Sequence, residues 1–161
     1  MWNKIKPYIL PYSVSIAIPL AIGALSAFIT KDSMNIYEDI NLPPLAPPGW
    51  LFPIVWTLLF VLMGVSSAMI YLKRKDDPKA VKHALTYYAM SLIANLAWSI
   101  IFFNFTVFGF AFLCLSLLLY LIIRTILAYY KIYPIAAYLQ IPYALWVAFA
   151  GYLNLMIYIL N

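Results

Sequence analysis

Amide and indole side chains recur at helical spacing in three apolar segments of the chain. Asn95, Trp98 and Phe102 follow an i, i+3, i+7 pattern, so they share one face of a predicted helix. Trp146 and Ala150 share a face of another helix, and Trp56 lies about two turns into a third. Indole rings stack on flat apolar molecules, and amides bind the few polar atoms that such molecules carry. The chemistry that this set can perform is therefore recognition of a flat, largely apolar ligand.

The same segments lack the arrangements that catalysis usually requires. They hold no Ser-His-Asp, Cys-His or paired-carboxylate set, which argues against acid–base and nucleophilic catalysis. His83 has no Cys, Asp or Glu at ligand spacing, so we expect it at a membrane interface rather than on a metal ion. The single cysteine, Cys114, cannot form an internal disulfide. We therefore expect no metal site and no bound cofactor.

The composition indicates that the solvent around most of the chain is lipid. Of 161 residues, 66% are hydrophobic and only 9% are charged, whereas soluble domains carry about 25% charged residues. A soluble fold of this composition would lack the polar surface needed to cover itself.

Charge-free blocks give the number of membrane spans, since one helix needs about 20 apolar residues to cross a bilayer. Four blocks contain no Lys, Arg, Asp or Glu, namely 7–30, 40–72, 83–123 and 132–161. The third block is too long for one crossing, and Asn104 to Gly109 offers a tight reversal within it. The fold class predicted is an all-α integral membrane bundle of five transmembrane helices. They form a single domain over 1–161, with helices near 5–29, 50–73, 80–103, 107–130 and 134–160 and a lid-like loop at 30–49.

The distribution of basic residues predicts the orientation. With a cytoplasmic N-terminus, nine of the ten Lys and Arg residues lie at the inner side, as the positive-inside rule expects. These are Lys4, Lys6, Lys73, Arg74, Lys75, Lys79, Lys82, Arg124 and Lys131. We therefore expect the C-terminus outside, and we read the net charge of +5 as a topology signal rather than a nucleic-acid surface.

Prolines precede the second and interrupt the fifth predicted helix. Five prolines and two tryptophans fall between Leu42 and Trp56, which predicts a stiff approach to the first turn of a helix. Pro142 removes a backbone hydrogen bond and is expected to kink or open the helix next to Trp146. Each aromatic or amide residue has a simpler explanation as an interfacial anchor or as a hydrogen bond between helices. The combination of these features favours a ligand pocket.

Three motifs in register then resemble the TspO/translocator protein family. The first is the Pro43–Pro48 segment with Trp50 and Val55-Trp56-Thr57, and the second is Asn95-Leu96-Ala97-Trp98-Ser99. The third is Pro142-Tyr143-Ala144-Leu145-Trp146 with Ala150 and Asn154. Their order and spacing cover nearly the whole chain, and this chain resembles a bacterial-type member.

The resemblance implies a five-helix bundle, a homodimer, and a pocket beneath a lid formed by the first loop. It implies ligands of the porphyrin type, such as protoporphyrin IX, and of the benzodiazepine type. Carried onto matching positions, it assigns ligand binding to Tyr37, Trp56, Asn95, Trp98, Trp146 and Ala150, with Trp56 and Trp146 facing the macrocycle.

Two departures from the family pattern stand out. Leu45 lies where many members carry a tryptophan, so the lid lacks one ring. The C-terminal sterol motif is incomplete, because Tyr158 is followed only by Ile159, Leu160 and Asn161; cholesterol is therefore not an expected ligand.

Three functions remain open at this point. The first is a membrane receptor, sensor or carrier for porphyrins in the bacterial cell membrane, with lipid and a second copy as its partners and no nucleic acid. The second is an enzyme that degrades porphyrin with light and oxygen, for which Trp56 and Trp146 are the candidate catalytic residues. The third is a structural membrane scaffold without a ligand. The small-residue pairs Gly23/Ala27 and Gly64/Ala68 permit close helix approach and are candidate dimer contacts.

Overall fold

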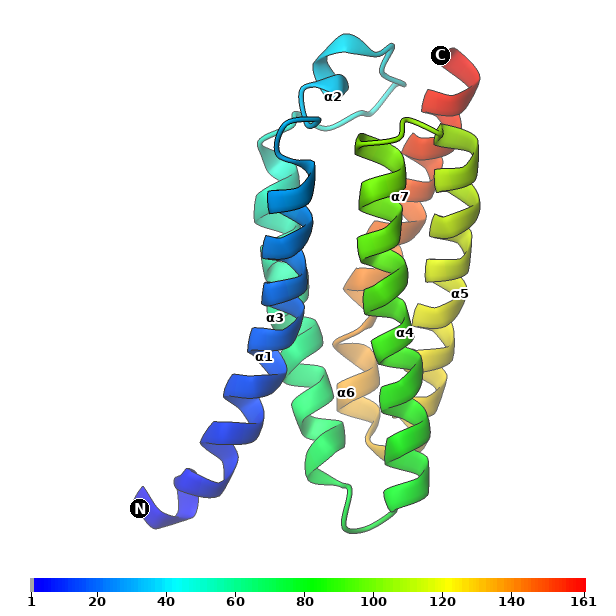
Figure 1. Ribbon diagram of the computed structural model, residues 1–161. Helices are drawn as coiled ribbons and strands as arrows, with labels where there is room; N and C mark the ends of the chain where they lie inside the picture. Colours follow the sequence, from blue (N-terminus) through cyan, green and yellow to red (C-terminus); the bar gives the residue numbers. More distant parts are fainter. Residues whose placement is uncertain (1) are drawn as a thin grey trace.

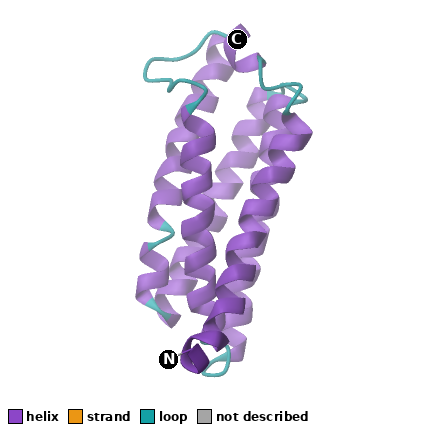
Figure 2. Ribbon diagram, turned by 90° about the vertical axis from the view of Figure 1, so that its left-hand side faces the viewer, coloured by secondary structure: helices purple, strands orange, loops and turns teal. Residues whose placement is uncertain are grey.

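A computed structural model describes residues 2–161, with side chains from residue 7 onward, and in this part of the chain helices are joined by loops and turns, with no strand (Figures 1 and 2). The lid loop and the C-terminus lie at one end of the bundle, and the N-terminus lies at the other (Figure 1). In chain order the helices are α1 (Trp2–Thr30), α2 (Ile36–Asp39), α3 (Leu51–Leu72), α4 (Pro78–Phe103), α5 (Phe108–Ile132), α6 (Pro134–Tyr138) and α7 (Ile141–Leu160).

The five predicted membrane spans are confirmed. Within the described residues, five helical segments are long and apolar enough to cross a bilayer, the last of them formed by α6 and α7 together. Asp77 caps α4, since its Oδ1 accepts a hydrogen bond from the Ala80 amide at 3.0 Å. The polar reversal after Phe103 also lies where the sequence indicates, between α4 and α5.

The fifth span is broken one turn before the position expected from its proline. The helix stops at Tyr138 and resumes at Ile141, so Pro142 lies in the first turn of α7, where a missing N–H leaves no helical bond unmade. Gln140 occupies the break with only 1% of its surface exposed, and its Nε2 donates to Ser66 Oγ at 3.1 Å. Ser66 in turn donates to the carbonyl of Ala136 at 2.7 Å. Ser66 of α3, itself bonded to Gln140, thus provides a hydrogen-bond donor for the Ala136 carbonyl next to the break.

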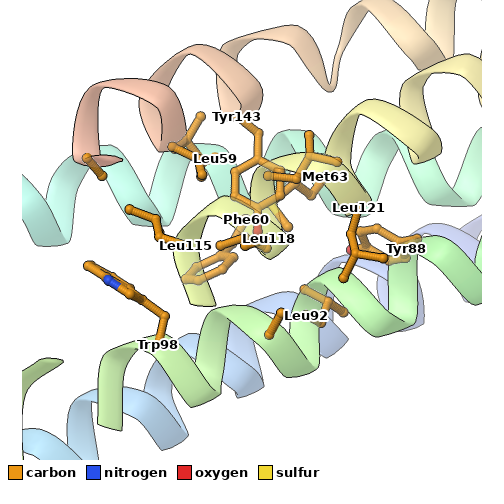
Figure 3. Close-up of a cluster of buried hydrophobic side chains, with 14 of the residues drawn as sticks. Leu59, Phe60, Met63, Tyr88, Leu92, Trp98, Leu115, Leu118, Leu121 and Tyr143 are labelled. Atoms are coloured by element: carbon orange, nitrogen blue, oxygen red, sulfur yellow. The ribbon is translucent and has the colours of Figure 1, made fainter. Parts of the chain in front are cut away.

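The spans close into a ring in which sequence neighbours are not always spatial neighbours. α1 packs on α3 and α4, α3 also contacts α6 and α7, and α5 packs on α4, α6 and α7. Figure 1 shows α1 and α3 as one leaning pair beside α4, α5 and α7. The core between the helices is formed by side chains from α3, α4, α5 and α7, among them Met63, Leu92, Leu118 and Tyr143 (Figure 3).

Gly64 allows the backbone of α1 to approach α3 closely. A Cβ at this position would lie 2.4 Å from the Ile16 Cα and 2.7 Å from the Ser15 carbonyl oxygen. Pro19, four residues after Ser15, has no N–H to bond that carbonyl. The backbone of α1 therefore lies directly on Gly64, at the turn that the proline has opened.

Candidate ligand-binding cavity

A cavity of about 390 Å³ lies between α1, α3, α4 and α7 and reaches the lid loop. This volume falls in the range of about 300–1,000 Å³ that small-molecule sites occupy. No residue lining it is charged, within the described part of the chain. α1 supplies Leu20, Gly23, Ala24, Ser26, Ala27 and Thr30; the lid supplies Met34, Tyr37 and Gly49; α3 supplies Phe52, Pro53, Trp56, Thr57 and Phe60; α4 supplies Asn95, Trp98, Ser99, Phe102 and Phe103; and α7 supplies Ala150, Leu153, Asn154 and Ile157.

Trp56 is the centre of the aromatic wall. Its ring centroid lies 6.3 Å from that of Trp98 on α4 and 5.5 Å from that of Phe60 on its own helix. The Tyr143 ring meets it edge-on at 6.2 Å. Such tilted and edge-on pairs are the arrangements that aromatic quadrupoles favour. The indole of Trp56 is consequently held from three sides while still lining the cavity.

Two amides fix the polar edge of the cavity. Asn154 accepts the Trp98 indole N–H at 3.0 Å through Oδ1 and donates from Nδ2 to the Phe108 carbonyl at 2.8 Å. Asn95 donates from Nδ2 to the Tyr143 hydroxyl at 3.0 Å, and this bond does not use its carbonyl oxygen. Both amides are buried, at 4% exposed or less. They can therefore position the indole of Trp98 and offer hydrogen bonds to a ligand in an otherwise apolar space.

Tyr37 connects the lid to the N-terminal end of α3. Its hydroxyl donates to the Pro47 carbonyl at 2.8 Å, and its ring meets Phe52 edge-on at 5.3 Å. Burial raises the pKa of the Tyr37 phenol above its ordinary value of 10.0. The phenol is thus a neutral donor at physiological pH, and the loop folds back over the cavity through this bond.

The lid is also attached to the C-terminal end of α7. The Asn41 amide donates to Asn161 Oδ1 at 2.9 Å, and Asn161 Nδ2 donates to the Asn41 carbonyl at 3.1 Å. Lower on α7, the Tyr152 hydroxyl donates to the Pro44 carbonyl at 3.0 Å. These bonds fix the start of the proline-rich segment to α7.

The structure brings five of the six residues assigned by sequence into this one cavity and leaves one out. Tyr37, Trp56, Asn95, Trp98 and Ala150 all line it. Trp146 does not, since its ring lies against Phe52 at 5.9 Å and Phe149 at 5.7 Å, and its buried indole N–H has no acceptor among the described residues. The aromatic partner of Trp56 in the cavity is Trp98 rather than Trp146.

The contribution of α1 was missed by sequence reasoning. Its lining residues are small or aliphatic and carry no motif, so only their i, i+3, i+4, i+7 spacing from Leu20 to Ala27 could have indicated a common face. Gly23 and Gly64, interpreted as dimer contacts, face α3 and α1 of the same chain instead: a Cβ at Gly23 would lie 2.3 Å from Phe60 Cε2. Ala27 lines the cavity, and Ala68 is fully buried.

Leu45 lies outside the cavity, on the outer side of the lid. Its side chain is 81% exposed, and its backbone has a φ of 70°, in the left-handed region. A tryptophan at this position would point in the same direction as the exposed leucine, away from the cavity. The missing lid tryptophan therefore removes surface from the loop rather than a wall from the cavity.

The chain is similar to known proteins over most of its length. The model of the TspO/MBR family matches residues 15–160. The chain is 36% identical over 154 residues to the "Tryptophan-rich protein TspO" of Chlorobaculum tepidum, covering 95% of this chain and 97% of that protein. It is 35% identical over 133 residues to the "Translocator protein" of Bos taurus, covering 82% and 79%, and 30% identical over 139 residues to "Protein CrtK" of Rhodobacter capsulatus, covering 86% and 85%.

Proposed function

Since the chain belongs to the TspO/MBR family, we propose that it is a membrane receptor or carrier that binds porphyrins, and benzodiazepine-type ligands, in the cavity beneath the lid. The observation that carries the proposal is the pair of indoles, Trp56 and Trp98, lining one uncharged cavity at a ring separation of 6.3 Å. A flat conjugated ligand gains most from such walls.

The polar groups support a ligand with a few central or peripheral polar atoms. The amides of Asn95 and Asn154 lie on the α4 and α7 walls and suit N–H or carbonyl groups. Carboxylates would be costly to bury in a cavity without cations. They suit the mouth instead, where Lys31 directly follows the lining residue Thr30. A porphyrin with its ring inside and its propionates at the lid meets both conditions.

Titration of the purified protein with protoporphyrin IX, followed by indole fluorescence, tests the proposal. Saturable quenching is expected for the wild type. Trp56→Phe should remove much of the quenching, whereas Trp50→Phe should not, because Trp50 is 67% exposed and does not line the cavity. Non-saturable quenching, or an equal effect of the two substitutions, would favour a scaffold without a ligand.

A second candidate is the light- and oxygen-dependent degradation of bound porphyrin. The same indole pair supports it, since Trp56 and Trp98 would lie next to an excited ring. Illumination of the porphyrin complex should then accelerate loss of the porphyrin spectrum relative to porphyrin in detergent alone. Equal decay rates would exclude this activity and leave binding unaffected.

The cellular context follows from the same premise. We propose that the chain resides in a bacterial cell membrane as a homodimer, with the α3–α4 turn in the cytoplasm and the lid outside. The basic residues of the α3–α4 turn and of the end of α5 support this orientation. Protease accessibility of the lid in whole cells against inverted vesicles tests it, and crosslinking in native membranes tests the dimer.

A further inference from the structure

A second hollow, of about 740 Å³, lies at the opposite end of the bundle from the lid, between α4, α5 and the α3–α4 turn. Unlike the first cavity, it is lined by charged groups. α5 supplies Arg124 and Lys131, α4 supplies His83 and Tyr87, and the turn supplies Lys73, Asp76 and Asp77.

Arg124 is held in place by aromatic rings rather than by a carboxylate. Its guanidinium carbon lies 4.9 Å from the Tyr87 ring centre and 5.8 Å from that of Tyr120. Nη1 also donates to the Tyr120 hydroxyl at 2.9 Å. This bond uses one of the five guanidinium N–H donors, so most of these N–H groups can still bind an acceptor outside the protein.

The acidic residues of the hollow are already engaged. Asp76 pairs with Lys73 at 3.8 Å, which is the one ion pair among the side chains described from residue 7 onward. Asp77 accepts the Ala80 amide as the cap of α4. Neither Arg124 nor Lys131 forms an ion pair with a carboxylate among the described side chains, and the two lie seven residues apart on the same face of α5.

The depth of Arg124 favours a lipid over a free anion. It precedes the end of α5 at Ile132 by eight residues, or about 12 Å of helix. Leu127 and Ile132 line the hollow beside it, and the Leu127 side chain is 56% exposed. Lys131 lies in the last turn of the helix, at the level of headgroups. Basic pockets between spans suit anionic headgroups, because the acyl chains stay in the bilayer.

We propose that this hollow binds the phosphate of an anionic phospholipid, with Arg124 and Lys131 on the phosphate oxygens and Leu127 and Ile132 against the start of the acyl chains. Bidentate contact from a guanidinium and a second cation matches a phosphodiester. The site is separate from the cavity beneath the lid and does not depend on what that cavity binds.

Native mass spectrometry of the purified protein titrated with dioleoyl phosphatidylglycerol or dioleoyl phosphatidylcholine tests this proposal. Phosphatidylglycerol should bind preferentially, and Arg124→Gln and Lys131→Gln should each weaken it about fivefold. The matched controls are Arg74→Gln and Lys79→Gln, which remove the same charges at the same end but do not line the hollow. Their affinity should stay within about twofold of the wild type, because they lack the contact with the phosphate.

Three outcomes would overturn the proposal. Equal binding of the two lipids would exclude headgroup selection, and equal losses in the control variants would reduce the effect to general surface charge. Displacement of phosphatidylglycerol by inorganic phosphate at equal concentration would assign the hollow to a free anion. Lys131 is exposed and outside the core, so Lys131→Gln carries the test if Arg124→Gln fails to fold by circular dichroism.

Discussion

The Trp98 indole N–H donates to Asn154 Oδ1 at 3.0 Å, and this one bond joins α4 to α7 at the wall of the cavity. Asn154 also reaches the Phe108 carbonyl in the first turn of α5. One amide therefore connects three spans and sets the orientation of an indole that a ligand would contact.

Removing the Asn154 side chain should destabilise the bundle. Asn154→Leu leaves the buried Trp98 N–H without its acceptor, which costs about 1–3 kcal/mol. Thermal unfolding in detergent measures the effect. Adding Trp98→Phe removes the orphaned donor, so the double variant should lose less than the sum of the two single variants. Simple additivity would show that the bond does not couple the two residues.

Filling the cavity from α7 should abolish ligand binding without unfolding the protein. Ala150 lines the cavity, whereas Ala148 is exposed on the same helix. Ala150→Phe should weaken protoporphyrin IX binding by about tenfold or more, and Ala148→Phe should leave it unchanged. Retention of full affinity in Ala150→Phe would place the ligand elsewhere.

The two glycines between α1 and α3 should respond differently to a single methyl group. Gly23→Ala meets the side chain of Phe60 rather than backbone, so we expect a smaller loss of stability than for Gly64→Ala, together with a change in the shape of the cavity and its affinity. Gly64→Ala meets the backbone of α1 at Ile16, which cannot yield locally, so we expect a loss of several kcal/mol, about the size of other overpacking defects or larger. Unfolding and porphyrin titration of both variants separate the two effects. Phe60→Leu combined with Gly23→Ala should restore part of the affinity.

The lid should loosen at high pH through Tyr37. Burial raises the pKa of this phenol above 10.0, so its hydrogen bond to Pro47 is complete at neutral pH and is lost as the pH rises through the raised value. Ligand dissociation in stopped-flow measurements should therefore be constant up to pH 10 and faster above it. Tyr37→Phe should dissociate faster at all pH values and show no such rise. An identical rise in Tyr37→Phe would assign the effect to another group.

Relief of the strained loop residue should stabilise the lid. Leu45 adopts a left-handed conformation with φ 70°, which costs a non-glycine residue about 1 kcal/mol or more. Leu45→Gly removes this strain, and because the Leu45 side chain is 81% exposed, little packing is lost. Thermal unfolding should shift upward or stay unchanged after the entropy of glycine is included. A clear downward shift would show that the leucine side chain makes contacts that the lid needs.

The spans and most of the cavity could be predicted because their signals are local. Charge-free blocks located the helices to within a few residues, and Asp77 and the reversal after Phe103 follow standard capping and turn chemistry. Trp56, Asn95, Trp98 and Ala150 could be grouped because each lies at a fixed helical phase on a face that points inward.

The remaining features depend on how helices are rotated and paired, which no single segment encodes. The motifs put Trp146 beside Trp56, but its ring lies against Phe52 and Phe149, while Ala150, one turn further along α7, lines the cavity. Gly23 and Gly64 allow close approach of any helix, and only the packing of α1 on α3 shows which helix that is.

The hydrogen bonds of Ser66 also have a consequence for biogenesis. The hydroxyl on α3 is synthesised well before the Ala136 carbonyl and Gln140, its two partners in the last span. A chain that ends after α5 lacks both of these partners, and its hydroxyl can then donate only within its own helix or to another span. Arrival of the fifth span thus both completes the ring and provides the partners of this hydroxyl.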